Sequence, residues 1–387
     1  MFPPRLCVIL SLAALFAAAG SSRPSATGGP HVSVVATPND GIQPQAVADD
    51  RGTIHIVYFK GDPGGGDVFY APVARTPEAG HAAPPVRVNS IAGSALATGT
   101  VRGAQIALGR NGIVHVAWHG SKPVEGGGSP HPPVWYARSI DGTRFEDQRM
   151  LSGAISGIDG STVAADRGGR VSVAWHGQGE KAGEQDRAVY LANSKDDGVS
   201  FAAPVPATSA PIGACGCCGL KALFDRGGAL NVLYRAATDG KHRDTTWLAI
   251  RGGAASAAVR VHPWEIEACP MSTFALADAG NGVAAAWETA QQIYAATLDP
   301  ATGSVKDLAA VPGTGSRKHP SIAVNAAGDR LLAWTEDTAW KRGGTFAWRI
   351  TNRAGTEIAH SADAEPVPVW GLVSAVAMPD GSFVIFR

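Results

Sequence analysis

A repeating pattern of apolar and polar positions organises the chain. An alternating apolar segment, a polar turn rich in Gly, Asp and Asn, and a second alternating segment that ends in an aromatic residue recur seven times. Each copy is typical of a β-hairpin. The aromatic residues that end the hairpins are Tyr58, Trp118, Trp175, Tyr234, Trp287, Trp334 and Phe386.

A third alternating segment follows six of the hairpins and carries its own aromatic residue. These residues are Tyr70, Tyr136, Tyr190, Trp247, Tyr294 and Trp348. A weaker fourth segment usually comes next, as at 85–90 and 258–263. Four antiparallel strands in each unit of about 50 to 60 residues are the pattern of a propeller blade. We therefore predict an all-β chain that forms a β-propeller of four-stranded antiparallel blades.

The number of blades follows from the incomplete last unit. Six units are complete, and the seventh consists of one hairpin at the C-terminus. The segment 31–38 (HVSVVATP) is a spare strand that can complete this blade and remove its exposed edge. We predict seven blades closed by an N-terminal strand, in a single domain spanning 31–387; six blades with an appended hairpin is the alternative. The Gly- and Pro-rich stretches 61–66 and 121–133 fall between second and third strands, so they predict long loops on one face.

Composition and the N-terminal segment restrict the partners and the compartment. Of the 387 residues, 45% are hydrophobic, which excludes wholesale disorder. Lys+Arg and Asp+Glu are both 33, so no nucleic-acid partner is expected. Arg5, the apolar run 6–19 and the small residues after it predict a signal peptide over about 1–25. We expect a secreted or periplasmic protein with no membrane span after cleavage.

Cysteines supply the most specific local chemistry. After removal of Cys7 with the signal peptide, the cysteines that remain are Cys215, Cys217, Cys218 and Cys269. An even number in an exported chain first suggests disulfides. The CGCC segment precedes the fourth hairpin and Cys269 precedes the fifth, so we expect the two segments to lie side by side on adjacent blades. The alternatives are a soft metal, Cu or Zn, bound by these thiolates with Met271, or a redox-active dithiol. Otherwise the sequence requires no cofactor.

Other candidate site residues lie where first strands begin and second strands end, around the expected channel mouth. Polar residues are expected at any solvated rim, but the density of Arg and His here exceeds that expectation. The candidate ligand-binding residues are Arg102, His119, His176, Arg235, Arg243, Arg317 and His319. Arg235 and Arg243 can clamp an anion, or Arg243 can pair with Asp244 instead. Asp159 and Glu288 are the weak catalytic candidates, as an acid and a base.

Two turn motifs carry a resemblance to a known superfamily. Residues 194–201 (SKDDGVSF) match the Asp-box pattern S-x-D-x-G-x-[ST]-[WF], and 139–145 is a shorter copy. The chain therefore resembles the sialidase-like (BNR-repeat, Asp-box) β-propeller superfamily over nearly all its mature length. The resemblance implies that Asp141 and Asp196 are structural turn residues on the face opposite the usual active site.

The same resemblance bears on function. Catalytic sialidases of this superfamily carry an Arg-Ile-Pro motif and a Tyr–Glu nucleophile pair. This sequence has no Arg-Ile-Pro, and its six tyrosines all occupy repeated blade positions. We therefore predict a binding propeller that holds an anionic glycan or another small ligand at the channel mouth, with a Cys-rich site between adjacent blades. A sialidase-type glycoside hydrolase (exo-alpha-sialidase) and a periplasmic protein that handles a soft metal or redox equivalents are the alternatives.

Overall fold

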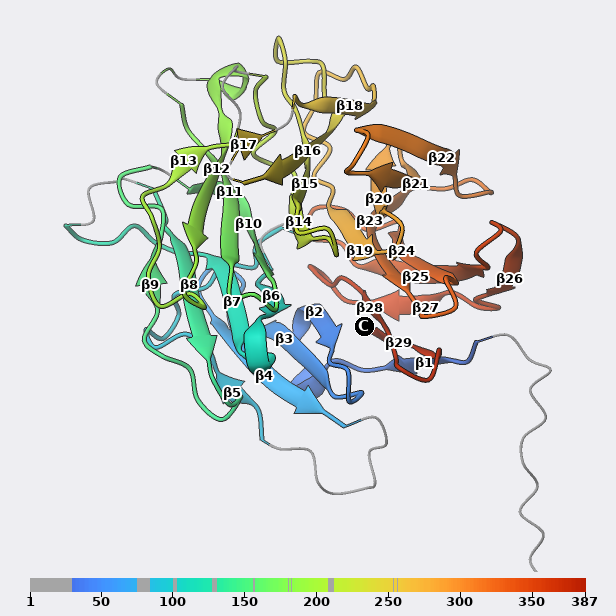
Figure 1. Ribbon diagram of the computed structural model, residues 1–387, viewed down its shortest axis with the longest axis horizontal. Coiled ribbons are helices and arrows are strands. Elements are labelled where there is room, and N and C mark those ends of the chain that lie inside the picture. The colour runs from blue at the N-terminus through green and yellow to red at the C-terminus, as the bar shows by residue number, and fades with distance from the viewer. Residues whose placement is uncertain are drawn as a thin grey trace, which may run out of the picture.

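Seven β-sheets follow one another around a ring, so that the first and last blades are neighbours (Figure 1). The computed structural model describes residues 30–74, 84–99, 103–126, 131–155, 157–179, 181, 183–207, 212–252, 254–255 and 257–387. The prediction of seven blades is confirmed, and the six-blade alternative is wrong. The predicted signal peptide lies outside the described residues. Within them, no helix has the length and apolar character that crossing a bilayer requires.

Blades 1 to 3 each contain four strands in sequence order from the channel outward. Blade 1 comprises β2 (Ile42–Ala48), β3 (Ile54–Lys60), β4 (Asp67–Val73) and β5 (Val86–Arg87). Blade 2 comprises β6 (Gln105–Leu108), β7 (Val114–His119), β8 (Val134–Ser139) and β9 (Arg149–Met150). Blade 3 comprises β10 (Gly157–Ala165), β11 (Val171–Gly177), β12 (Ala188–Ser194) and β13 (Val205–Pro206).

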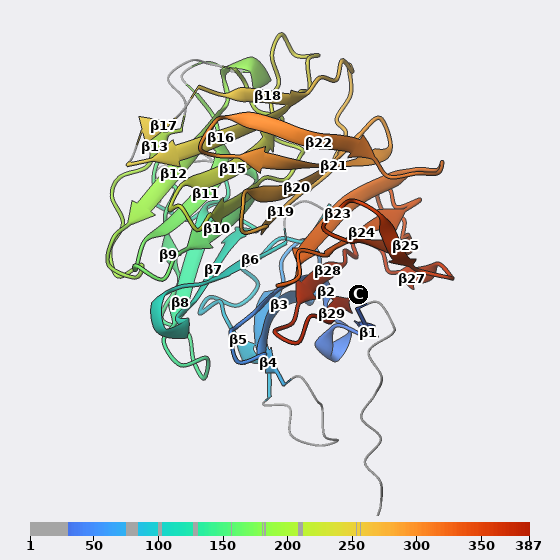
Figure 2. The same ribbon diagram turned by 45° about the vertical axis from the view of Figure 1, so that its right-hand side comes forward.

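Blades 4 and 6 carry one outer strand more than predicted. Blade 4 comprises β14 (Lys221–Phe224), β15 (Leu230–Arg235), β16 (Thr245–Arg251), β17 (Ala254–Ala255) and β18 (Val259–His262). Blade 5 comprises β19 (Phe274–Asp278), β20 (Val283–Thr289), β21 (Gln292–Asp299) and β22 (Ser304–Ala310), which succeed one another outward (Figure 2). Blade 6 comprises β23 (Arg317–Val324), β24 (Arg330–Glu336), β25 (Gly344–Thr351), β26 (Glu357–His360) and β27 (Glu365–Val367). In blades 4 and 6, two short strands share one edge of the third strand.

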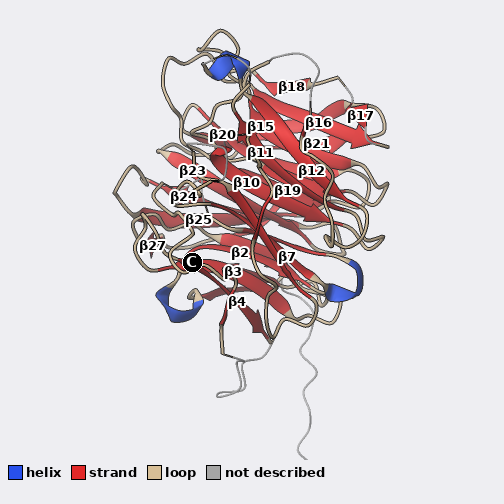
Figure 3. Cartoon of the chain, turned by 90° about the vertical axis from the view of Figure 1, so that its left-hand side faces the viewer, coloured by secondary structure: helices blue, strands red, loops and turns tan. Residues whose placement is uncertain are grey.

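Short polar turns join the first two strands of each blade. The Asp49 carboxylate accepts the backbone N–H groups of Arg51 (2.9 Å) and Thr53 (2.8 Å), and Gly52 supplies the φ of 85° that the turn requires. Asp166 accepts backbone N–H groups at the same place in blade 3. Helical structure in the described residues is confined to three 3-10 turns at the edges of the ring (Figure 3). They are η1 (Pro38–Asp40), η2 (Arg110–Gly112) and η3 (Glu184–Asp186).

Aromatic residues of the second strands form the packing between blades. All seven are buried, and Trp334 is the most exposed at 5%. Several stack on the aromatic residue of the neighbouring third strand, as Trp175 does on Tyr190 with ring centroids 6.2 Å apart. Burial of such a side chain contributes about 1.5–3 kcal/mol. The regular spacing of these residues along the sequence therefore corresponds to one buried aromatic residue in each blade.

The N-terminal strand closes the ring, as predicted. Blade 7 contains β28 (Ser374–Ala377), β29 (Phe383–Phe386) and β1 (Val32–Val35). However, β1 runs parallel to β29, so this blade has three strands and is not fully antiparallel. The reason is topological: β29 runs toward the end of the ring where β2 begins, and β1 must run the same way to deliver the chain there. Thr37, just after β1, donates its backbone N–H to the Arg387 carbonyl (2.8 Å).

Candidate functional site

A central channel of about 900 Å³ runs through the ring and is lined by the first strands of the seven blades. Lys221, the first residue of β14, lines this channel. Its ammonium donates hydrogen bonds to the side-chain oxygens of Gln105 (2.7 Å) in β6 and Gln45 (3.2 Å) in β2. The side chain therefore links blade 4 to blades 1 and 2 through the channel.

Burial lowers the pKa of Lys221 to about 8, and no charged group offsets this effect. The described residues include no carboxylate in an ion pair with it. By contrast, Asp50 and Arg167 pair at 2.5 Å where the first strands end. Lys221 is thus a cation on the channel wall whose partners are neutral amides. Our sequence reasoning missed it, although a lysine opening a first strand, where other repeats have Gln or Ser, was a visible signal.

Three cysteines converge beside the entrance to β14. The Sγ atom of Cys215 lies 3.2 Å from the Sγ atoms of both Cys217 and Cys218, and all three sulfurs lie within 4.8 Å of one another. Cys215 and Cys218 are buried, whereas Cys217 is partly exposed. The Cys218 N–H donates to the Cys215 carbonyl (3.1 Å), which closes the turn that brings the thiols together. We call these three residues the thiol cluster.

The pKa values of Cys217 and Cys218 are shifted in opposite directions. Burial acts to raise the pKa of Cys218, but hydrogen bonds from Cys215 and Cys217 and the nearby Arg235 guanidinium hold it well below its usual range. The pKa of Cys217 is raised by its hydrogen bonds to the other two thiols and by burial. The arrangement therefore favours one thiolate, at Cys218, that two thiols stabilise.

The predicted adjacency of the two cysteine segments is present in the backbone, but the expected disulfides are not. The Gly219 N–H donates to the Ser272 carbonyl (2.9 Å), so the CGCC segment lies against the segment that leads into β19. Cys269, however, is free and exposed and is not a member of the thiol cluster. The other three cysteines are also free, since 3.2 Å far exceeds the roughly 2.05 Å of an S–S bond. Met271 adopts a φ of 46° just before Ser272.

The expected anion clamp of Arg235 and Arg243 is not formed. Arg235 is fully buried and donates to the backbone carbonyls of Arg243 (2.7 Å) and Glu288, and its guanidinium lies 4.8 Å from the Trp264 ring centroid. Arg243, 4% exposed, pairs with Glu184 at 2.5 Å rather than with Asp244. Both side chains therefore stabilise contacts within the fold around the thiol cluster.

The other carboxylate and ligand candidates are also placed inside the fold. Glu288 is 1% exposed and accepts the Gln291 N–H (2.6 Å); burial raises its pKa against the lowering effect of Arg235. Arg317 is 8% exposed and pairs with Glu336 at 3.1 Å. Asp159 lies in β10, but its side chain is outside the described part of the structure, as is the whole of Arg102.

The three histidine candidates are buried. His119 contacts the Gly120 carbonyl through Nδ1 at 2.9 Å, and the His176 ring lies 6.5 Å from that of Tyr234. His319 lines the channel beside Thr273, and burial lowers its pKa to about 3. Of the residues predicted to bind a ligand, His319 alone among those described lines the channel.

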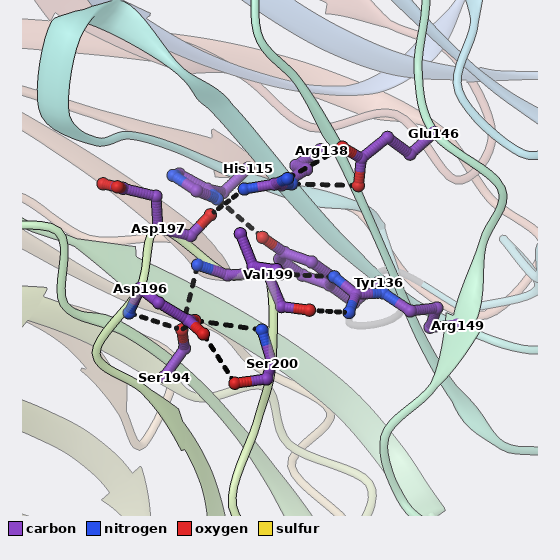
Figure 4. A network of polar contacts seen from close by, with 11 residues as sticks. His115, Tyr136, Arg138, Glu146, Arg149, Ser194, Asp196, Asp197, Val199 and Ser200 are labelled. Carbon is purple, nitrogen blue, oxygen red and sulfur yellow. Dashed lines mark hydrogen bonds and ion pairs between the residues drawn. The ribbon is translucent and has the colours of Figure 1, made fainter.

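The Asp-box of blade 3 forms a turn with structural roles (Figure 4). Asp196 accepts hydrogen bonds from Ser194 (2.7 Å) and from the N–H (2.9 Å) and hydroxyl (2.6 Å) of Ser200. These bonds lower the pKa of Asp196. The carbonyl of the next residue, Asp197, accepts a hydrogen bond from Arg138 of blade 2 (2.7 Å), so the turn also joins two blades.

Comparisons with known proteins agree with the fold. No protein-family model matches the sequence, and no curated protein matches it. Among solved structures, the chain is similar to the BP39L lectin of Burkholderia pseudomallei, with TM-score 0.60, 13% identity, and coverage of 89% of this chain and 95% of the lectin. It is also similar to an alpha-L-arabinanase of Penicillium chrysogenum, with TM-score 0.54, 10% identity, and coverage of 85% and 99%. A leech intramolecular trans-sialidase gives TM-score 0.51, 10% identity, and coverage of 85% and 68%.

The class of this protein follows from its sheets and its Asp-box turns. It is an all-β, seven-bladed propeller, and its fold is similar to that of the lectin, the arabinanase and the trans-sialidase. Sequence identities this low show the fold alone, so the function has to be inferred from the channel and the side chains that line it.

Proposed function

We propose that this chain is an exported binding protein whose central channel takes a small anionic sugar, with Lys221 as the cation that recognises the acid group. The observation that carries the proposal is the Lys221 ammonium, held in the channel by the amide oxygens of Gln45 and Gln105. An incoming carboxylate or sulfate would supply the negative partner that burial of this ammonium makes favourable.

The shape and chemistry of the channel support a sugar acid. Its volume of about 900 Å³ falls in the range of small-molecule sites, roughly 300–1,000 Å³. Gln45 and Gln105 line the channel with amide groups that can serve ligand hydroxyls, although the Gln105 amide also donates to the Gly103 carbonyl (3.4 Å), and Ser161 and Ser321 line it too. Carbohydrate as the ligand class is further supported by the similar structures, which include a lectin and an arabinanase complexed with arabinobiose.

Sialidase-type hydrolysis is not part of the proposal. Such chemistry needs a tyrosine nucleophile beside a glutamate, and the tyrosines here are used in blade packing. Tyr70 and Tyr136 pair with histidines at 2.7 Å, Tyr58 and Tyr234 are buried, and Tyr190 donates to the Gln178 carbonyl.

Binding of matched sugars tests the proposal. Isothermal titration of the full chain at pH 7 with sialic acid, glucuronic acid and galacturonic acid, and with their neutral parent sugars, should show binding of at least one acid and at least tenfold weaker binding of its neutral partner. Lys221→Gln should lose that preference, whereas Lys306→Gln, an exposed site on β22, should keep it. Equal affinity for acid and neutral sugars, or unchanged acid binding by Lys221→Gln, would overturn the proposal.

A further inference from the structure

The thiol cluster is a second concentration of reactive groups, separate from the Lys221 ammonium. Its three sulfurs lie within 4.8 Å of one another, with the closest separations at 3.2 Å. Cys215 and Cys218 are sealed in the interior, and the partly exposed Cys217 gives a route from the surface. Convergence of three soft donors on one point is unusual for structural cysteines, which need only packing or one partner.

Two buried arginines flank the cluster and have unused donors. Arg243 lies within electrostatic range of Cys215 and Cys217, and Arg235 lies within range of Cys218. Among the described residues, Nε and Nη1 of Arg243 and Nε of Arg235 have no hydrogen-bond acceptor. A buried charged donor without an acceptor is costly, and negative charge on the sulfurs, which lie within electrostatic range of both guanidinium groups, would offset part of that cost. The surroundings therefore favour a high density of negative charge at the sulfurs.

We propose that Cys215, Cys217 and Cys218 bind one soft monovalent metal ion, Cu(I), as three thiolates at the junction of blades 4 and 5. Thiolates suit both Cu(I) and Zn(II), but a structural zinc site needs a fourth protein ligand, whereas three thiolates are enough for Cu(I). The cluster offers three donors within the described residues. On binding, three sulfur–metal bonds form and each sulfur that still carries a proton releases it to solvent, with no change of oxidation state.

The geometry and charge fit this ion. With metal–sulfur bonds of about 2.3 Å, a trigonal site has sulfurs about 4 Å apart. The 3.2 Å separations would therefore lengthen by less than about 1 Å. A monovalent ion with three thiolates carries a charge of −2, which the guanidinium groups of Arg235 and Arg243 offset. Glu184 pairs with Arg243 and is itself partly exposed to solvent.

Anaerobic titration of the reduced full chain with Cu(I), in competition with the chelator bicinchoninate, tests the site. We expect one copper per chain and an X-ray absorption spectrum with three sulfur neighbours at about 2.3 Å. Cys217→Ser should weaken Cu(I) binding at least about a hundredfold. Because Cys217 is partly exposed, this variant should stay folded, which its melting temperature checks. Cys269→Ser is the matched control, since Cys269 is exposed and outside the cluster, and its copper affinity should be unchanged.

Several results would overturn the copper site. These are an absence of copper binding by the reduced protein, equal affinity in Cys217→Ser, or tighter binding of zinc through a fourth ligand. A reduced protein that binds no copper but forms a Cys215–Cys218 disulfide on oxidation would show a redox dithiol instead. The outcome is separable from that of the sugar proposal, because Lys221→Gln should still bind copper and Cys217→Ser should still bind the sugar.

Discussion

Lys221 should make the stability of this protein rise with pH above 8. Its pKa is about 8 in the folded chain and 10.5 in its ordinary, solvated state. Below pH 8 the ammonium is charged in both the folded and the unfolded chain, so the folded state is destabilised by the full free energy of burying the charge. Between pH 8 and 10.5 the unfolded chain binds more protons, so the free energy of unfolding increases with pH. Each pKa unit corresponds to about 1.4 kcal/mol, so the total gain is about 3 kcal/mol.

Lys221→Met removes the titrating group and isolates this effect. Urea unfolding of both proteins at pH 7 and pH 10.5 should show the wild type gaining about 3 kcal/mol relative to the variant. The hydrogen bonds to Gln45 and Gln105 are absent from the variant at both pH values, so their loss largely cancels in this comparison. Lys306→Met, at an exposed site, serves as the control and should show no such change. A stability difference between wild type and Lys221→Met that does not vary with pH would refute the reasoning.

Two further predictions concern the ring itself. A chain that starts at residue 37 should be about 3 kcal/mol less stable than one that starts at residue 30, because it loses four residue pairs with β29 and the partly buried Val32 and Val34. Thermal melting measures this difference, and an unchanged melting temperature would contradict the closure of the ring by β1. Arg235→Met should cost about 2–5 kcal/mol in denaturant unfolding, because it leaves the buried carbonyls of Arg243 and Glu288 without a donor; a loss below about 1 kcal/mol would show that these bonds are replaceable.

The fold was predictable because its information is local and repeated. Each hairpin carries its own alternation, turn residues and buried aromatic, so seven weak signals add up to one architecture. The direction of β1 was not predictable in this way. Its sequence alternates in the same manner whichever way it runs, and its parallel pairing depends on where β2 must begin. The extra strands β17 and β27 are likewise set by the space beside a third strand rather than by their own short sequences.

The sequence indicated which residues lie at the strand ends, but not the direction of their side chains, and it did not single out Lys221. His119, Arg235 and Glu288 follow the second-strand aromatic, and we treated them as rim residues. In the structure their strands continue through these positions, with β7 ending at His119, β15 at Arg235 and β20 at Thr289. Successive side chains of a strand point to opposite faces, so a residue next to an aromatic packed against one neighbouring blade faces the other blade. Their polar groups are thus enclosed between sheets.

The same geometry explains why ligand chemistry should be sought on the first strands. A side chain at the end of a second strand lies between two sheets, and Arg235 shows the consequence, since it binds the carbonyl of Glu288 on the next blade. A side chain in the middle of the ring, such as Lys221 on a first strand, instead faces the open volume around which the seven first strands converge. Lys221 lies only a few residues after the CGCC segment in the sequence. Even so, Lys221 faces the open volume, whereas the thiol cluster is enclosed beside Arg235 and Arg243. The strand-to-loop boundary before β14 therefore separates two different chemistries, an ammonium in the channel and soft donors between the blades.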